Sequence, residues 1–561
     1  MLLYPTFGKT GRLGNQIMQL MSMIGIAKTA GCEFQVPTWA YSSCFANPPK
    51  QYDPSKKIDI AHHLEEPEFH YHGPYFQQYA EQMRDQNVSI FGWLQSKRYW
   101  NNAIEEVKKA MEFDKEFITS TNRLLPSHLE GGRQRIAISV RRGDYVGNRN
   151  YELLPVTYYI QALLEHFPDY WNYDILIFSD DIDYCKVHFQ VLENVWFAEN
   201  LTDIQQMCAM SHCQNFILAN STFSWCAAMM SELRGWARKI IRPAYLFAGP
   251  LAYKETADFW PENWIRHDHR NNKLNLKDVT FTIPVSYDSR DRKENLDLCL
   301  KLLTTDFDTN VIVGEHGRVA RFEYVRSHDV KYMRFEMDAF HRTKMLNDMA
   351  LEAKTEFVAN WDADVLLPPM QIIEAVRRLK EGEDFVYPYD GRFARVPRGT
   401  WYNTIDKFQD VGMFGGTEFS GTKPGEPLSV GGALIFRMEK FVDAGMENEN
   451  MISYAPEDAE RYDRFRRLGF NVSRVIGVLY HIDHLITKNS SIAHPHYKDN
   501  MDEWTKLRHM SDSELKEYVK TWPWAKGYTP LYYESVFEES VRSRDVVFDV
   551  LREWGIIAPG M

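Results

Sequence analysis

The sequence has few cysteines and no stretch apolar enough to cross a membrane. Its 561 residues include seven cysteines, which are scattered and form no Cys-x-x-Cys pair. This pattern favours a reducing compartment over a disulfide-stapled scaffold. No run of 18 apolar residues occurs, and the first residues lack the basic and apolar regions of a signal peptide. We therefore expect a cytoplasmic protein without a membrane span, with peripheral membrane contact left open.

The chain also lacks positive net charge, internal repeats and low-complexity segments. Its formal net charge of −12 argues against nucleic acid as the main partner, because a phosphate backbone attracts basic surfaces. A nucleotide-sugar remains compatible, since it needs only a local cluster of Arg, Lys or metal. The length exceeds what one hydrophobic core usually organises, so two or more domains are expected.

Alternating strand and helix patterns occur twice along the chain, which predicts an α/β fold in each half. Between the halves, residues 245–276 are rich in Pro, Trp, Asn and Asp and are interpreted as a linker. The sequence thus predicts a first domain over 1–275, a second over 279–496 and a helical tail over 497–561. The elements expected are strands at 135–140, 174–179, 215–218, 279–285 and 310–314, and helices at 156–166 and 292–303.

A basic loop follows the first of these strands directly. Arg141, Arg142, Gly143 and Asp144 come at its carboxyl end, where open parallel sheets bind ligands. Two adjacent guanidinium groups suit a diphosphate, and the glycine lets the backbone approach closely. An ion pair between an arginine and Asp144, without any ligand, is an equally ordinary explanation of the motif.

Three further segments accompany this loop in the first half. They are Gly11–Gln16 (GRLGNQ), Phe91–Ser96 (FGWLQS) with Tyr99 and Trp100, and Asn220–Trp225 (NSTFSW). Together with ISVRRGDY, these motifs resemble the α-1,2-fucosyltransferase family over roughly residues 1–270. The resemblance implies a GT-B-type fold of two Rossmann-like lobes, GDP-fucose as donor, inversion at the anomeric carbon and no metal.

The resemblance also implies roles for individual residues. Arg141 and Arg142 would hold the GDP diphosphate, and Asp144 would act as base or orient an arginine. The family's usual histidine two residues before the Arg pair is Ser139 here, which has no imidazole charge or basicity and so puts donor affinity or activity in question. The residues expected to line the cleft or bind nucleotide are Gly14, Asn15, Gln16, Asn220, Ser221 and Thr222.

An acidic pair follows an apolar strand in the second half. Asp362 and Asp364 form an Asp-x-Asp motif, which suits a divalent cation bridging a diphosphate, although aspartates also cap turns. Later come Glu457 with Asp458, and then His481 and His484. Imidazole combined with carboxylates favours Mn²⁺ over Mg²⁺.

This second set is similar to the β-1,4-galactosyltransferase-like and chondroitin-polymerase-like enzymes of the GT-A type. Phe340–Asn347 (FHRTKMLN) looks like their sugar-nucleotide motif, and Ile283-Pro284 with Arg290 and Arg292 looks like their first strand and uridine-side loop. The resemblance covers roughly residues 279–490. It implies a UDP-sugar donor, Mn²⁺ and inversion.

Roles again follow from the resemblance. Asp364 would ligate the metal, Asp362 would contact ribose or metal, and His481 or His484 would add a ligand, the alternative being a buried structural histidine. Asp458 would be the general base, and Glu457 would bind the acceptor or orient that base; acids at a helix N-terminus are the plain alternative. Tyr454 stands where galactosyltransferases carry a Trp against the sugar. The donor-binding set is completed by Arg290, Arg292, Phe340, Arg342 and Gly432.

The sequence therefore predicts a bifunctional glycosyltransferase that uses GDP-fucose and a UDP-sugar on one glycan acceptor, with galactose as the candidate hexose. In the alternative, only the second domain is catalytic and the first binds or scaffolds the glycan. A pure lectin would not need the Asp-x-Asp, Glu-Asp and His motifs together.

Overall fold

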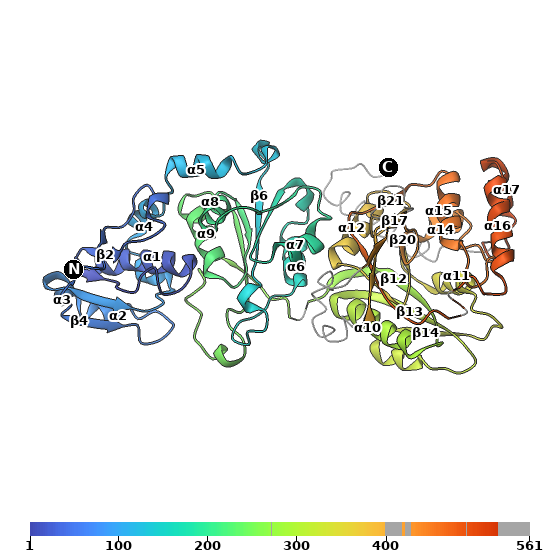
Figure 1. Ribbon diagram of the computed structural model, residues 1–561, viewed down its shortest axis with the longest axis horizontal. Coiled ribbons are helices and arrows are strands. Elements are labelled where there is room, and N and C mark those ends of the chain that lie inside the picture. The colour runs from blue at the N-terminus through green and yellow to red at the C-terminus, as the bar shows by residue number, and fades with distance from the viewer. Residues whose placement is uncertain (271, 399–417, 421–427, 488, 490, 526–561) are drawn as a thin grey trace, which may run out of the picture. The chain divides into compact units, whose positions relative to one another are not determined.

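The computed structural model describes residues 1–525 except 271, 399–417, 421–427, 488 and 490. The chain divides into two compact units, Met1–Asn272 and Lys273–Met561 (Figure 1). Both are mixed α/β structures with parallel strands. Among the described residues, no helix has the length and apolar character that a membrane crossing requires.

The first unit begins with a five-stranded parallel sheet in the order β3-β2-β1-β5-β4. Helix α1 is buried along most of its length and packs on this lobe and on α9. The bounds are β1 Leu2–Leu3, α1 Leu13–Ala30, β2 Phe34–Pro37, β3 Gln51–Tyr52, β4 His62–Glu65, α2 Gly73–Gln77, α3 Ala80–Asp85, β5 Val88–Phe91, α4 Ile104–Ala110 and α5 Lys115–Asn122.

A six-stranded parallel sheet follows, in the order β11-β10-β9-β6-β7-β8. Figure 1 shows α8 and α9 on one face of it and α6 and α7 on the other. The predicted strands 135–140 and 174–179 and the helix 156–166 are confirmed with the same bounds. The bounds are β6 Arg135–Val140, α6 Val156–His166, β7 Asp174–Ser179, α7 Ile182–Phe189, β8 Val195–Phe197, α8 Asp203–Ser211, β9 Asn215–Ile217, α9 Thr222–Leu233, β10 Lys239–Pro243 and β11 Ile265–His267.

Residues 245–276 do not form the predicted linker. Phe259, Trp260 and Trp264 are buried in the core of the first unit, and β11 pairs in parallel with β10. The high content of Pro, Asn and Asp suggested a linker, but three large aromatic side chains anchor the stretch, because burying them removes a large apolar area from water. The units divide after Asn272.

The second unit contains a seven-stranded sheet in the order β14-β13-β12-β15-β20-β17-β21. The strands from β14 to β15 are parallel, and β20 runs antiparallel to both β15 and β17. A hydroxyl cap from Ser289 starts α10, by accepting a hydrogen bond from the Arg292 amide. The bounds are β12 Leu274–Ser286, α10 Arg290–Asp306, β13 Phe307–His316, β14 Lys331–Phe335, α11 Arg342–Glu352, β15 Phe357–Trp361, α12 Pro369–Lys380, β17 Phe385–Tyr387, β20 Ala433–Arg437, α14 Met438–Asp443, α15 Glu457–Arg467 and β21 Val472–Arg474.

A smaller sheet has the order β16-β22-β18-β19. It matters for function because β16 follows the Asp-x-Asp motif directly and pairs antiparallel with β22, which carries His481. The strands are β16 Val365–Leu366, β18 Phe393–Val396, β19 Glu418–Ser420 and β22 Leu479–Ile482.

The described part of the predicted helical tail consists of α16, Tyr497–His509, and α17, Asp512–Lys520. Both pack on the second unit through an apolar cluster that includes Met451 and Trp522. The remainder of the predicted tail, 526–561, lies outside the described residues.

Candidate active sites

The first candidate site lies where the strand order of the six-stranded sheet reverses. β6 and β9 are neighbours there, and the chain leaves them toward opposite edges of the sheet. Ligands of open α/β sheets bind beyond the carboxyl ends of the strands at this point. A cavity of about 770 Å³ occupies the position, within the size range of small-molecule sites. Arg141, which follows β6 directly, lines this cavity, and so does Asn220, which follows β9.

The glycine-rich segment before α1 forms another wall of this cavity. Gly11 has a φ of 79°, a backbone angle that residues other than glycine rarely adopt. A Cβ on Gly14 would lie 2.4 Å from the Phe223 backbone nitrogen at the start of α9. Gly14 therefore allows the two helices to approach closely. Asn15 also lines the cavity, and its side-chain oxygen accepts a hydrogen bond from Gln95 Nε2 at 2.6 Å.

Gln16 was predicted to line the cleft, but its side chain is buried beneath the glycine-rich segment. Its Nε2 donates to the Gly11 carbonyl at 3.1 Å, and its Oε1 accepts from Trp39 Nε1 at 2.9 Å. The amide thus holds the loop in shape and is absent from the cavity lining. The polar character of the GNQ motif could not distinguish this role from ligand contact.

Arg141 reaches the cavity with its guanidinium held by two carboxylates. Nη1 lies 2.7 Å from Asp180 Oδ2, and Nη2 donates to Asp144 Oδ1. Asp144 also lies 3.6 Å from Arg12 Nη2, so two guanidinium groups share its charge. The expected ion pair between an arginine and Asp144 is present. It orients Arg141 toward the cavity.

Arg142 was predicted to share the diphosphate with Arg141, yet the structure places its side chain elsewhere. It is 3% exposed, its guanidinium stacks 3.7 Å from the ring centre of Tyr184, and its Nε lies 3.1 Å from Asp181. Strand β6 ends at Val140, and Arg142 has a φ of −131° and a ψ of −64°, so the two arginines lie in a turn that sends their side chains to different surroundings. Of these two arginines, only Arg141 lines the cavity.

The loop after β9 supplies the amino end of α9. Asn220 donates from Nδ2 to the backbone carbonyls of Glu152 and Leu246, at 2.9 and 3.0 Å, which fixes the loop. Ser221 caps the helix by accepting from the Phe223 amide, and both Ser221 and Thr222 line the cavity. A helix amino end carries partial positive charge and favours anionic groups, so this edge of the cavity adds to the positive potential of Arg141. Ser139 also lines the cavity.

An aromatic wall, which the sequence motifs did not reveal, completes the cavity. Tyr145 and Tyr151 stack with ring centres 4.4 Å apart, and Phe247 lies 5.7 Å from Tyr151 and 5.0 Å from Phe69. All four side chains line the cavity. Flat apolar faces of this kind suit a nucleobase or a sugar ring.

The second candidate site, in the second unit, forms where β16 pairs with β22. Val365 lies opposite His481, and the Ile482 amide donates to the Asp364 carbonyl at 2.8 Å, so Asp364 meets both histidines. His481 Nε2 is 3.5 Å from Asp364 Oδ1, and His484 Nε2 is 3.2 Å from Asp364 Oδ2. Each of the three residues offers one ligand atom, and these atoms lie within 4.8 Å of one another.

These three residues fit a divalent cation. The His484 Nδ1 is 2.9 Å from the Leu485 carbonyl, and in the tautomer that donates its Nδ1 proton to this oxygen the Nε2 has a lone pair toward Asp364. Histidines that bind metals are commonly oriented by such a contact. A carboxylate and two imidazoles suit Mn²⁺ better than Mg²⁺. The Arg292 Nη1 also lies 2.5 Å from Asp364 Oδ2, so a positive group is already stabilised at this carboxylate.

The charges around Asp364 also determine its protonation. The side chain is 3% exposed, and burial by itself would raise the pKa of Asp364. His481, Arg292 and His484 outweigh burial and hold that pKa below its ordinary value. Asp364 is therefore an anion at neutral pH, as a metal ligand must be.

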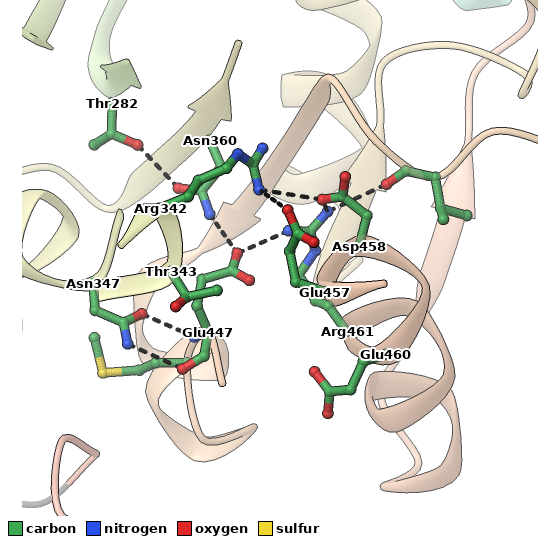
Figure 2. A network of polar contacts seen from close by, with 12 residues as sticks. Thr282, Arg342, Thr343, Asn347, Asn360, Glu447, Glu457, Asp458, Glu460 and Arg461 are labelled. Atoms are coloured by element: carbon green, nitrogen blue, oxygen red, sulfur yellow. Dashed lines mark hydrogen bonds and ion pairs between the residues drawn. The ribbon is translucent and has the colours of Figure 1, made fainter. Parts of the chain in front are cut away.

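Asp362 lies apart from the metal cluster and takes part in a second network. Figure 2 shows Arg342 directed toward Glu457 and Asp458 at the start of α15. Arg342 Nη2 donates to Asp362 Oδ1 at 2.8 Å, and Nη1 lies 3.5 Å from Glu457 and 3.4 Å from Asp458. Because Arg342 engages all three carboxylates, it fixes the distance between the Asp-x-Asp turn and α15.

Glu457 and Asp458 are the first residues of α15, and their protonation differs. Burial, reinforced by the charge of Asp458, raises the pKa of Glu457 to about 8 although Arg342 opposes the shift. Burial also raises the pKa of Asp458, but Arg342 and Arg461 outweigh it and hold that pKa below its ordinary value. Neighbouring carboxyl groups with separated pKa values are typical of acid and base roles.

The remaining predicted donor-binding residues occupy different positions. Arg290 is exposed and pairs with Glu294 within α10, and the Phe340 ring lies 5.8 Å from that of His316. Gly432 has a φ of 83°, and its carbonyl accepts from the Asp362 amide at 2.9 Å, so it shapes the Asp-x-Asp turn through its backbone. A Cβ at the preceding Gly431 would lie 2.6 Å from Asp458 Oδ2.

A buried support for the network was not predicted. Glu447 is fully buried and accepts from Asn360 Nδ2 at 2.7 Å and from Arg461 Nη1 at 2.9 Å, while Arg461 Nη2 donates to Asp458 at 2.8 Å (Figure 2). Asn347, the last residue of the FHRTKMLN motif, pairs its amide with the backbone N–H and carbonyl of Glu447. The motif's asparagine was the one available signal that this position supports the site.

Tyr454, which precedes α15, is 41% exposed and stacks on Tyr497 with ring centres 6.1 Å apart. Asn500 of α16 donates to the carbonyls of Ile452 and Tyr454 at 2.8 and 3.1 Å. The helical tail therefore supports the loop that carries Tyr454.

Comparison with known proteins addresses the first unit. Residues 4–265 match the family model of glycosyl transferase family 11. An alpha-1,2-colitosyltransferase from Escherichia coli is 27% identical over 191 residues, which are 32% of this chain and 62% of that protein. The O-antigen biosynthesis glycosyltransferase WbnK from Escherichia coli is 30% identical over 131 residues, 22% of this chain and 43% of that protein. The chain thus spans less than two thirds of either relative. The match agrees with the predicted glycosyltransferase-like first half.

Solved structures gave weaker matches. A glucosyl-3-phosphoglycerate synthase from Mycobacterium tuberculosis, in complex with Mn²⁺, UDP and phosphoglyceric acid, matches with a TM-score of 0.24 and 16% identity over 37% of this chain and 72% of that one. A mycobacterial protein matches with a TM-score of 0.26 and 16% identity over 38% of this chain and 70% of that one.

Proposed function

We propose that this chain is a glycosyltransferase with two donor sites, in which the first unit transfers a sugar from a GDP-linked donor. The observation that carries the proposal is the placement of Arg141 and the amino end of α9 in one cavity at the reversal of strand order. Such a cavity suits a nucleotide diphosphate. The family match over residues 4–265 supports the same assignment.

In this proposal the first unit has a GT-B-type arrangement, with fucose as the expected donor sugar. The colitosyltransferase relative makes a colitosyl donor the second candidate. The acceptor hydroxyl attacks the anomeric carbon and releases its proton to solvent, the bond to the diphosphate breaks, and Arg141 stabilises the negative charge that develops on the leaving group. Because Asp144 is shared between Arg141 and Arg12, it orients Arg141 in this scheme.

In the same proposal, residues 279–496 of the second unit carry out a second transfer, of the GT-A type. Asp364, His481 and His484 would hold Mn²⁺, which would offset the charge of a UDP diphosphate. Asp458 would accept the proton of the acceptor hydroxyl as that oxygen attacks the donor sugar, and protonated Glu457 would donate a hydrogen bond to the acceptor. Tyr454 stands at the exposed edge, where a hexose would enter.

Two observations favour the alternative, in which the first unit only binds the glycan. Ser139 occupies the position of the imidazole in the resembled family, and Arg141 already pairs with two carboxylates. The two schemes differ in whether GDP-fucose is turned over.

A donor screen of the full chain tests the proposal, with nucleotide release as the readout. We expect Arg141→Ala to abolish GDP-sugar turnover and to leave UDP-sugar turnover intact, with Arg149→Ala, an exposed arginine of the same loop, as the matched control. Asp364→Ala or EDTA should have the reverse effect, with Asp483→Asn as control, since Asp483 pairs with Arg395 instead. Loss of both activities in a folded Asp364→Ala protein would refute the two-site scheme.

If both activities are present, products made with one donor at a time would give the order of transfer. We expect the second unit to add a hexose that the first unit then fucosylates, because fusion raises the local concentration of the intermediate. Fucose transfer to the bare acceptor would reverse this order.

A further inference from the structure

A second cluster of imidazoles and a carboxylate lies in the first unit, outside the cavity. Glu165 and His166 are the last residues of α6, and His267 is the last residue of the edge strand β11. Each offers one ligand atom, and the three atoms lie within 4.8 Å of one another. None of the three residues lines the cavity.

The distances in this cluster suit a shared ion better than direct hydrogen bonds. His267 Nδ1 is 3.4 Å from Glu165 Oε2, and His166 Nε2 is 3.8 Å from Glu165 Oε1. Nitrogen–oxygen hydrogen bonds are shorter, at about 2.7–3.2 Å. Ligands around a tetrahedral zinc ion, each about 2.0–2.2 Å from the metal, lie roughly 3.3–3.6 Å from one another.

Burial makes the arrangement hard to explain without a ligand. The His267 side chain is 3% exposed and that of His166 is 14% exposed. Within the described residues, the buried His166 Nε2, which faces Glu165, has no hydrogen-bond partner. Buried polar atoms are nearly always satisfied, so this nitrogen calls for a partner.

We propose that Glu165, His166 and His267 bind a divalent transition-metal ion of the Zn²⁺ class, which cross-links the end of α6 to the edge strand β11. Glu165 is 59% exposed, which leaves a fourth position open to water. β11 has three residues and one neighbouring strand, so the ion would fasten a weakly held edge. Its role is structural.

The test uses the full chain with Asp364→Ala in every sample, so that the second unit's cluster does not contribute. Zn²⁺ is titrated in competition with a chromophoric chelator, and thermal unfolding is followed with and without Zn²⁺. We expect His267→Gln to remove one bound equivalent, or to weaken it at least 10-fold, and to remove the rise in unfolding temperature that Zn²⁺ causes. His212→Gln is the matched control, since His212 is a half-buried histidine of the same unit that contacts the Cys208 carbonyl.

Glu165→Gln guards against misfolding, because this exposed side chain can be changed without disturbing the core. It should weaken Zn²⁺ binding and leave the unfolding temperature in EDTA unchanged. Equal Zn²⁺ stoichiometry and affinity in the parent, His267→Gln and Glu165→Gln proteins would overturn the proposal, whether or not either transferase activity is found.

Discussion

The buried ion pair between Arg461 and Glu447 allows a prediction that needs no substrate. Arg461 is 2% exposed and Glu447 is fully buried, and Glu447 Oε1 accepts from both Arg461 and Asn360. Replacing Arg461 with Met keeps most of the side-chain volume but leaves Glu447 charged and held by one amide. Removing one partner of a buried pair typically costs about 3–5 kcal/mol, and we expect this range for Arg461→Met.

The double variant identifies the physical cause. Glu447→Gln keeps the shape of the side chain and removes its charge, so Arg461→Met combined with Glu447→Gln should cost less than the sum of the two single changes, by about 1–3 kcal/mol. If the loss came from packing alone, the costs would add.

The second unit must be observed by itself, because two units unfold in one chain. Hydrogen–deuterium exchange of peptides from β20 and α15, measured over increasing urea, reports the local opening free energy. Asp443→Asn, on the surface side of α14, serves as a control that should change it by less than about 0.5 kcal/mol. A cost below about 1 kcal/mol for Arg461→Met, or strict additivity in the double variant, would refute the reasoning.

Three further predictions concern the sites and the pH dependence of stability. Asp458→Asn should reduce UDP-sugar transfer about 10²- to 10⁴-fold, because it removes the general base. Glu457→Gln mimics the protonated acid, so it should retain most of the activity below pH 8 and should not show the fall in rate that the parent protein shows above pH 8. Equal losses in both variants would contradict the assignment. Ser139→His should improve GDP-fucose KM or kcat by about 10- to 150-fold, equivalent to about 1.5–3 kcal/mol, and unchanged constants would make the imidazole dispensable here. Burial raises the pKa of Asp306 to about 7, so the folded state keeps a proton that the unfolded state has lost, and stability falls as pH rises from about 4 to 7. Because the side chain is half-buried, Asp306→Asn should stabilise the second unit by about 1–2 kcal/mol at pH 8 and by little at pH 4, measured by hydrogen–deuterium exchange of second-unit peptides over increasing urea. Equal effects at both pH values would exclude this cause.

Local patterns in the sequence were sufficient to predict the secondary structure around the sites. Strand β6 and helix α6 have the predicted bounds, because a continuous apolar run and a helical period are properties of neighbouring residues. The Asp-x-Asp motif was placed at the end of a strand for the same reason, and β15 ends at Trp361. The motif resemblance in the first half agrees with the family match over residues 4–265.

Packing between distant segments determined which of the predicted residues reach the sites, and the sequence could not show this. Arg141 and Arg142 are equivalent in the sequence, but in the turn after β6 one side chain enters the cavity and the other is buried on Tyr184. Gln16 is polar and stands in the motif, yet its amide holds the loop backbone.

The histidines near Asp364 and near Glu165 also meet only through tertiary structure. Asp364 and His481 are more than a hundred residues apart, and only the pairing of β16 with β22 brings them together. His166 and His267 meet because β11 returns to the edge of the sheet, and the aromatic residues that anchor this return had suggested a linker. The sequence by itself determined which chemical groups are present and which local elements carry them. The tertiary structure decided which groups meet, because burial and strand pairing depend on residues far apart in the chain.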